Sequence, residues 1–135
     1  MQHRLSSYRA GGGWLVLDDA FNSNPTGAAN ALGVLKAMEG GKKLIMTPGM
    51  IELGEEQDRL NGLFGEMIAG VCDEVILVGP KRTMPIAEGI RRRGFPEEQL
   101  HIVKNLKEGF EKVQALAGPE AVLLIENDLP DSYNE

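Results

Sequence analysis

The sequence lacks several features that define large classes of protein. It has a single cysteine, Cys72, so no disulfide can form within the chain and no cysteine cluster can hold a metal. It has no apolar run approaching the roughly 18 residues of a membrane-spanning helix. No long apolar segment follows Met1, as it would in a signal peptide. These absences predict a cytoplasmic protein of a reducing compartment, without a membrane partner.

Positive charge is also scarce. The sequence has 14 Lys and Arg residues against 20 Asp and Glu residues, which gives a formal net charge of -6. A nucleic-acid-binding protein needs a basic face that neutralises phosphates, so the composition argues against a nucleic-acid partner. A small anionic ligand remains compatible with it, because backbone N–H groups and one or two cations are enough to bind one.

Short apolar runs are present at regular intervals along the chain. The length of 135 residues predicts one domain, and a hydrophobic content of 42% is enough for a core of two or three layers. The runs are continuous rather than alternating, which is typical of parallel strands buried on both faces. The predicted strands are Trp14–Leu17, Leu44–Met46, Val75–Val78, His101–Val103 and Val122–Ile125.

Helical patterns separate these strands. They follow Pro25 and then cover approximately Leu60–Val71, Thr83–Arg93 and Leu106–Ala117. Alternating strands and helices predict a parallel sheet with right-handed crossovers. In addition, Arg4–Ala10 precedes a turn of three glycines and predicts an antiparallel edge strand. The expected fold is an α/β, Rossmann-like three-layer sandwich around a mostly parallel six-stranded sheet with one antiparallel edge strand.

The segment Asp18–Pro25 carries the strongest chemical signal. It follows a predicted strand, and ligands of open parallel sheets bind beyond the carboxyl ends of the strands. An aspartate there can accept hydrogen bonds from both hydroxyls of a ribose, and Phe21 can pack against a purine. Asn24 can cap the next helix, whose positive end then faces an anion. The alternative is an ordinary strand–turn–helix in which Asp and Asn satisfy local backbone groups.

Four segments, in the right order, resemble the C-terminal domain of the Mur ligase family. The most similar branch joins D-Ala-D-Ala to a UDP-MurNAc-peptide. Asp18–Pro25 is similar to the segment that opens this domain. His3-Arg4 resembles the hinge before the domain. Thr47–Glu55 resembles the loop after its second strand, and Glu126–Asp131 resembles the tail of one branch.

The resemblance implies a role in an ATP-dependent amide ligase of peptidoglycan synthesis. ATP activates a carboxylate of the UDP-MurNAc-peptide as an acyl phosphate, and the amine of D-Ala-D-Ala attacks it. In the family, the N-terminal domain binds the UDP-linked substrate, and the central domain supplies the P-loop and the Mg²⁺ ligands. The C-terminal domain closes on the ribose and adenine side of ATP and presents the amine substrate.

Two groups of site residues follow from the resemblance, and neither includes a catalytic residue or a metal ligand. The nucleotide side comprises Arg4, Asp19, Phe21, Asn22 and Asn24. The amine-substrate side comprises Thr47, Gly49 and Glu52. Among these, Glu52 would hold an ammonium group.

The sequence contains no G-x-x-x-x-G-K-S/T phosphate-binding loop. Phosphoryl transfer depends almost wholly on positioning and electrostatics, so we expect the chain, residues 1–135, to be inactive alone. We expect it to work with the missing N-terminal and central domains, and to bind neither ATP nor Mg²⁺ tightly by itself.

Two alternatives stay open. One is a ligase of the type that extends folate with glutamate, whose segment usually has Gly and His where this sequence has Asp19 and Phe21. The other is a binding module without catalysis.

Overall fold

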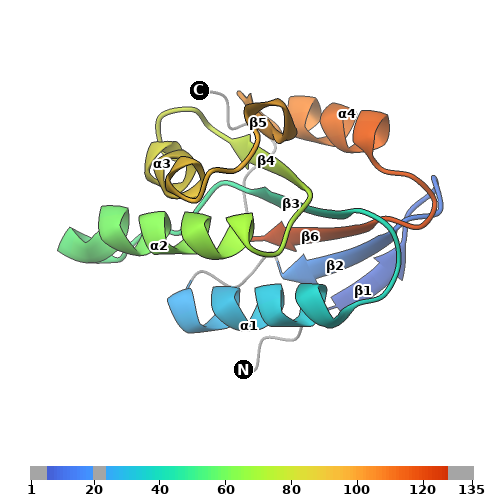
Figure 1. Ribbon diagram of the computed structural model, residues 1–135, viewed down its shortest axis with the longest axis horizontal. Helices are drawn as coiled ribbons and strands as arrows, with labels where there is room; N and C mark the ends of the chain where they lie inside the picture. Colours follow the sequence, from blue (N-terminus) through green and yellow to red (C-terminus); the bar gives the residue numbers. More distant parts are fainter. Residues whose placement is uncertain (1–5, 20–23, 128–135) are drawn as a thin grey trace.

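A six-stranded sheet with helices on both faces forms a three-layer α/β fold (Figure 1). The structure, a computed structural model, describes residues 6–19 and 24–127. The strands are β1 (Ser6–Arg9), β2 (Leu15–Asp19), β3 (Lys43–Thr47), β4 (Glu74–Val78), β5 (Leu100–Val103) and β6 (Val122–Glu126). The α-helices are α1 (Pro25–Ala37), α2 (Gln57–Ala69), α3 (Met84–Arg92) and α4 (Leu106–Leu116), and two 3₁₀ helices cover Gly54–Glu56 and Glu97–Gln99. No helix among the described residues is long and apolar enough to cross a membrane.

The sheet has the strand order β1-β2-β6-β3-β4-β5. The pairing of β1 with β2 is antiparallel, and the pairs among the other strands are parallel. The predicted fold is therefore confirmed, including its antiparallel edge strand. The last strand among the described residues, β6, lies between β2 and β3, in the interior of the sheet.

The two faces of the sheet have separate hydrophobic cores. The helices α1, α2 and α3 cover one face and α4 covers the other (Figure 1). Successive side chains of a strand point to opposite faces. Leu17 of β2 and Leu124 of β6 accordingly pack under α1–α3, whereas Val16 and Leu123 pack on the α4 side. The same alternation decides where the polar residues at the strand ends point.

Glycines allow α2 and α3 to approach each other closely. A Cβ atom added at Gly65 would lie 2.2 Å from the carbonyl oxygen of Ile86. One added at Gly89 would lie 2.0 Å from the carbonyl oxygen of Gly62. Because any larger residue would collide with backbone, the contact between these helices depends on glycine at both positions.

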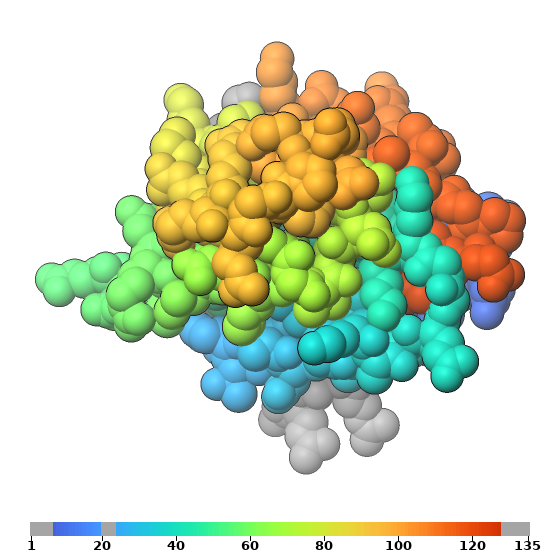
Figure 2. Space-filling view, in the orientation of Figure 1, coloured from blue at the N-terminus to red at the C-terminus, as the bar shows by residue number. Residues whose placement is uncertain are grey.

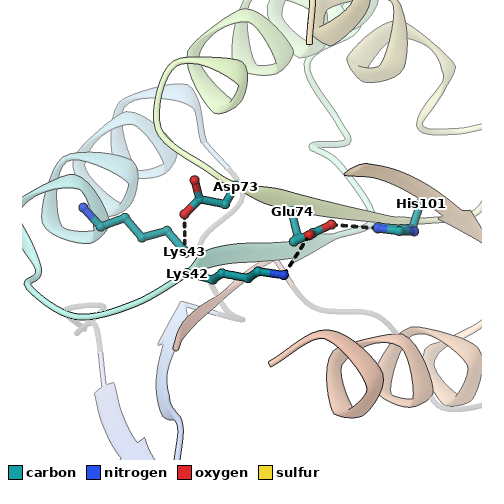
Figure 3. Close-up of polar contacts among 5 residues, drawn as sticks. All are labelled: Lys42, Lys43, Asp73, Glu74 and His101. Carbon is teal, nitrogen blue, oxygen red and sulfur yellow. Dashed lines mark hydrogen bonds and ion pairs between the residues drawn. The ribbon is translucent and has the colours of Figure 1, made fainter. Parts of the chain in front are cut away.

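A polar cluster occupies the amino ends of β3, β4 and β5 (Figure 3). Glu74 is 5% exposed, and its carboxylate accepts a hydrogen bond from Lys42 Nζ at 3.2 Å. The other carboxylate oxygen contacts His101 Nε2 at 2.9 Å. The backbone N–H of Lys43 donates to Asp73 Oδ2 at 2.9 Å. These contacts give the buried carboxylate its partners, so His101 has a structural use at this edge of the sheet.

Candidate functional site at the carboxyl edge of the sheet

Three polar side chains lie on one face of the sheet, at the carboxyl ends of neighbouring strands. Asp19 ends β2, Glu126 ends β6 and Thr47 ends β3. Asp19 and Glu126 are register partners, so their side chains point to the same side. Alternation along the strands places all three on the face covered by α1–α3 and sends Asp18 to the α4 face. This edge therefore carries two carboxyl groups side by side.

The carboxyl group of Glu126 is buried without a matched partner. The residue is 0% exposed, and neither carboxyl oxygen has a hydrogen-bond partner of ordinary geometry among the described residues. Burial, as the largest cause, raises the pKa of Glu126 to about 10. The Asp19 carboxyl adds to this pKa shift through a hydrogen-bonding contact outside ordinary geometry and through its negative charge. Glu126 is therefore a neutral acid at pH 7.

Asn127 joins the ends of three strands. Its backbone N–H donates to the carbonyl oxygen of Asp19 at 3.2 Å, and its side-chain amide donates to the carbonyl oxygen of Gly49. Its φ of 70° lies in the left-handed region, which Asn tolerates better than most residues. The segments that leave β2, β3 and β6 are thus tied together around the two carboxyl groups.

The segment after β3 is held in place by buried hydrogen bonds. Thr47 Oγ1 accepts from the backbone N–H of Gly49 at 3.0 Å. Gly49 has a φ of 88°, and a Cβ there would lie 3.0 Å from the side chain of Ile86. The side chain of Asn61, in α2, accepts from the N–H of Met50 and donates to its carbonyl oxygen, both at 2.9 Å. These bonds fix the backbone that borders the carboxyl groups.

The N-terminus of α1 completes the edge. Asn24 caps the helix, because its side-chain oxygen accepts from the backbone N–H of Gly27 at 2.8 Å. Pro25 begins the helix, and its first turn contains no acidic residue. The positive end of the helix dipole is therefore not neutralised by a carboxylate of the helix itself, which suits an anionic ligand group.

A mostly apolar groove of about 360 Å³ opens between α1 and α2. It adjoins the carboxyl edge, since Pro25 follows the capping residue Asn24 and Met50 follows Gly49. Figure 2 shows α1 (blue) against α2 (green), whose first turns project beyond the rest of the molecule. The groove is lined by Pro25, Thr26, Ala29, Asn30, Met50, Leu60, Leu63, Phe64 and Met67.

The structure brings together most of the described residues that the sequence assigns to the site. Asp19, Asn24, Thr47 and Gly49 all lie on segments that border the carboxyl edge. Glu52 lies farther along the chain, exposed to solvent, with a φ of 62°. The predicted residues that lie outside the described part of the chain are Arg4, Phe21 and Asn22.

Three residues of this edge were not predicted from the sequence, namely Glu126, Asn127 and Asn61. One signal was available, because Glu126 directly follows the wholly apolar run Val122–Ile125 and so stands at a strand's carboxyl end. The role of Asn61 depends on a helix packing beside Met50, which no local pattern reveals. Within residues 6–19 and 24–127, no group of three or more His, Cys, Asp or Glu side chains is arranged to hold a metal ion.

Comparisons with known proteins find relatives by sequence. Residues 3–126 match the Mur ligase family through its glutamate ligase domain. The UDP-N-acetylmuramoyl-tripeptide–D-alanyl-D-alanine ligase of Bacillus subtilis is 32% identical over 88 residues, which are 64% of this chain and 19% of that protein. The chain thus spans about a fifth of the length of this curated relative.

Solved structures share the fold. The MurF ligase of Thermotoga maritima, in complex with ADP, superposes with a TM-score of 0.74 at 20% identity, over 95% of this chain and 28% of that one. MurF of Acinetobacter baumannii gives a TM-score of 0.70 at 22% identity, over 95% of this chain and 27% of that one. A domain from a putative UDP-N-acetylmuramate:L-alanyl-gamma-D-glutamyl-meso-diaminopimelate ligase of Haemophilus ducreyi gives a TM-score of 0.62 at 17% identity, over 93% of this chain and 89% of that one.

Proposed function

The chain belongs to the Mur ligase family, and we propose that it is the C-terminal domain of an ATP-dependent amide ligase of peptidoglycan synthesis. In this proposal the ligase adds D-Ala-D-Ala to a UDP-MurNAc-peptide in the cytoplasm. The choice of D-Ala-D-Ala over glutamate as the amine substrate is supported by the name of the Bacillus subtilis relative.

The position of Asp19 is the observation that supports a nucleotide as the ligand. It ends β2 at the carboxyl edge, close to the N-terminus of α1, where open parallel sheets bind their ligands. A carboxylate there accepts hydrogen bonds from both hydroxyls of the ATP ribose. Arg4, Phe21, Asn22 and Asn24 belong to the same proposed nucleotide side. The Thermotoga maritima ligase with the same fold is an ADP complex, which supports a nucleotide as the ligand.

The amine substrate approaches the same edge from the segment after β3. In our proposal Thr47 shapes this segment through its bond to Gly49, and the Gly49 backbone and Glu52 border the dipeptide. Mg²⁺ and the ATP phosphates belong to the central domain in this proposal. The lack of a P-loop motif in the sequence supports this division.

The test is a matched pair of substitutions in a ligase in which this chain follows the substrate-binding and P-loop domains. Asp19→Asn removes the charged acceptor while keeping its size. Asp18→Asn makes the same change on the opposite face of the sheet. Since a hydrogen bond to a charged group contributes about 1.5–3 kcal/mol, Asp19→Asn should raise the KM for ATP by about ten- to a hundredfold. Asp18→Asn should change it by less than about threefold, as expected for a residue outside the site.

The measurement is ATP-dependent phosphate release at varied ATP with saturating amine and UDP-linked substrates. Equal KM values for ATP in the two variants would contradict the proposed role of Asp19. Activity with glutamate in place of D-Ala-D-Ala would contradict the proposed amine substrate and favour the folate-extending branch.

A further inference from the structure

Glu126 has a chemical environment that the proposed ATP site does not explain. Its side chain is 0% exposed, and both carboxyl oxygens lack an ordinary hydrogen-bond partner in the described part of the chain. Buried polar groups are nearly always paired, because an unpaired one costs about 1–3 kcal/mol. An unpaired carboxyl at the ligand-binding edge of a sheet therefore suggests that its partner is a ligand.

A cation that carries N–H donors fits this position best. The neutral carboxyl of Glu126 can donate and accept, but once it is ionised it offers only acceptors, and Asp19 beside it adds a second negative charge. A divalent metal would need further ligands, and the described residues provide no group of three suitable side chains. An ammonium group instead carries three N–H donors on one positive charge, which matches two adjacent carboxyl groups without a third.

We propose that Glu126 receives the ammonium group of the amine substrate at the carboxyl edge, with Asp19 contributing to the attraction. This inference rests on the proposed function, which supplies an amine substrate. It assigns the ammonium to Glu126 rather than to the exposed Glu52. Glu126 is a binding and positioning residue here, because the contact orients the amine and leaves its covalent bonds unchanged.

The proton balance follows from the state of Glu126. Without a cation it is a neutral acid. When the ammonium binds, the carboxyl proton leaves to solvent and an ion pair replaces the buried neutral group, so one proton is released for each amine bound. Binding therefore strengthens with pH until the ligand amine itself loses its proton near its pKa of about 8.

The apolar groove between α1 and α2 gives the rest of the substrate a place. It begins at Pro25 and Met50, and Met50 follows Gly49, whose carbonyl oxygen holds the Asn127 side chain next to Glu126. The groove is therefore lined by the residue next to Gly49, to whose backbone the neighbour of Glu126 is bonded. Small aliphatic groups, such as the methyl groups of D-Ala-D-Ala, fit that groove.

The experiment titrates the 135-residue chain with D-Ala-D-Ala and follows amide NMR signals, in particular those of Gly49 and Asn127. N-acetyl-D-Ala-D-Ala is the matched ligand, because it keeps the peptide and loses the positive charge. We expect the free dipeptide to bind at least about tenfold more tightly, as the loss of a charged hydrogen bond implies. Its affinity should rise by up to about tenfold per pH unit from about pH 6 to about pH 7.5.

Variants then locate the ammonium. Glu126→Gln keeps the size of the side chain and should remove both the tenfold preference for the free amine and the pH dependence. Glu120→Gln makes the same side-chain substitution at an exposed position before β6, far from the carboxyl edge, and this variant should bind like the wild type. Isothermal titration in two buffers of different ionisation enthalpy should detect about one released proton in the wild type and none in Glu126→Gln.

Several results would overturn the inference. One is that the wild type shows no detectable binding of the dipeptide, and another is that it binds the acetylated ligand as tightly as the free dipeptide. A third is that Glu52→Gln loses binding whereas Glu126→Gln does not. MgCl₂ that produces the same shifts and proton release would point to a metal site instead. The KM for ATP in the Asp19→Asn ligase tests the proposed function separately, so a failure of one can be told from a failure of the other.

Discussion

At the carboxyl end of β6, Glu126 links the acid–base chemistry of one residue to the stability of the domain. Burial and Asp19 raise its pKa from 4.5 to about 10. In the unfolded chain the same side chain loses its proton at an ordinary pKa. Between these two values the native state holds a proton that the unfolded state releases, so the free energy of unfolding falls as pH rises.

Glu126→Gln should therefore stabilise the domain at neutral and alkaline pH. The wild type should lose up to about 1.4 kcal/mol per pH unit relative to the variant, because Gln has no proton to lose. The free energies of unfolding of the two proteins should be most alike near pH 4.5 and should diverge above it. Urea unfolding at several pH values measures the difference, with Glu120→Gln as the exposed control. Parallel stability curves for wild type and Glu126→Gln would show that Glu126 titrates normally in the native state.

Only one residue of the carboxyl pair was predicted from the sequence. Asp19 was predictable because a polar segment directly follows an apolar strand, and Asn24 because it precedes a proline and a helical pattern. Glu126 was not assigned, since its meaning depends on pairing with Asp19, and the two are distant in sequence. The roles of Asn127 and Asn61 depend on hydrogen bonds to Gly49 and Met50, which are contacts between different elements.

Among the elements, the pair α2 and α3 is sensitive to very small changes. The two helices approach so closely that backbone of one occupies the space of a methyl group on the other. Protein interiors are close-packed, so an inserted methyl group cannot be absorbed without moving a helix. The site is affected too, because α2 carries Asn61, which holds the backbone of Met50.

Gly89→Ala should destabilise the domain by about 1–3 kcal/mol or more. The added Cβ would lie 2.0 Å from the carbonyl oxygen of Gly62, so the helices must separate. Gly33→Ala is the matched control, since Gly33 lies within α1, is exposed and has no atom within 4 Å of the added Cβ. It should stabilise by about 0.5–1 kcal/mol through helix propensity. Chemical denaturation of both variants tests this, and destabilisation of equal size would contradict the packing argument.

Element type was easier to predict than element arrangement. The helix at Met84–Arg92 and the strand at Glu74–Val78 follow local patterns of apolar residues and were predicted within a few positions. The antiparallel edge strand β1 followed from the glycine turn before β2. The insertion of β6 between β2 and β3 was not predicted, because strand order is set by long-range packing rather than by any local pattern. The close α2–α3 contact escaped prediction for the same reason.

The reactivity of Cys72 measures how often the folded domain opens. It is 5% exposed in the core under α1–α3. Burial, followed by the charge of Asp73, raises the pKa of its thiol well above the ordinary range. The thiolate is the reactive form of cysteine, so both access and ionisation suppress its reactivity in the folded domain.

Native Cys72 should consequently react with a disulfide reagent such as Ellman's reagent only through unfolding. At neutral pH the labelling rate should be at least about a thousandfold below that of the urea-unfolded chain, as expected for a core position in a domain stable by about 5 kcal/mol or more. Gly89→Ala should accelerate labelling and Gly33→Ala should slow it. Rapid labelling of the wild type without denaturant would contradict this and would indicate local opening near the end of α2.

The central position of β6 has a consequence for how the protein is made in the cell. Translation produces β2 and β3 long before β6, yet these two strands pair with β6 and not with each other. Until β6 emerges from the ribosome, β2 and β3 each present a strand edge whose backbone groups lack their partner in the sheet. Such edges are prone to aggregation, so we expect chaperones to bind the emerging chain until β6 pairs with both neighbours.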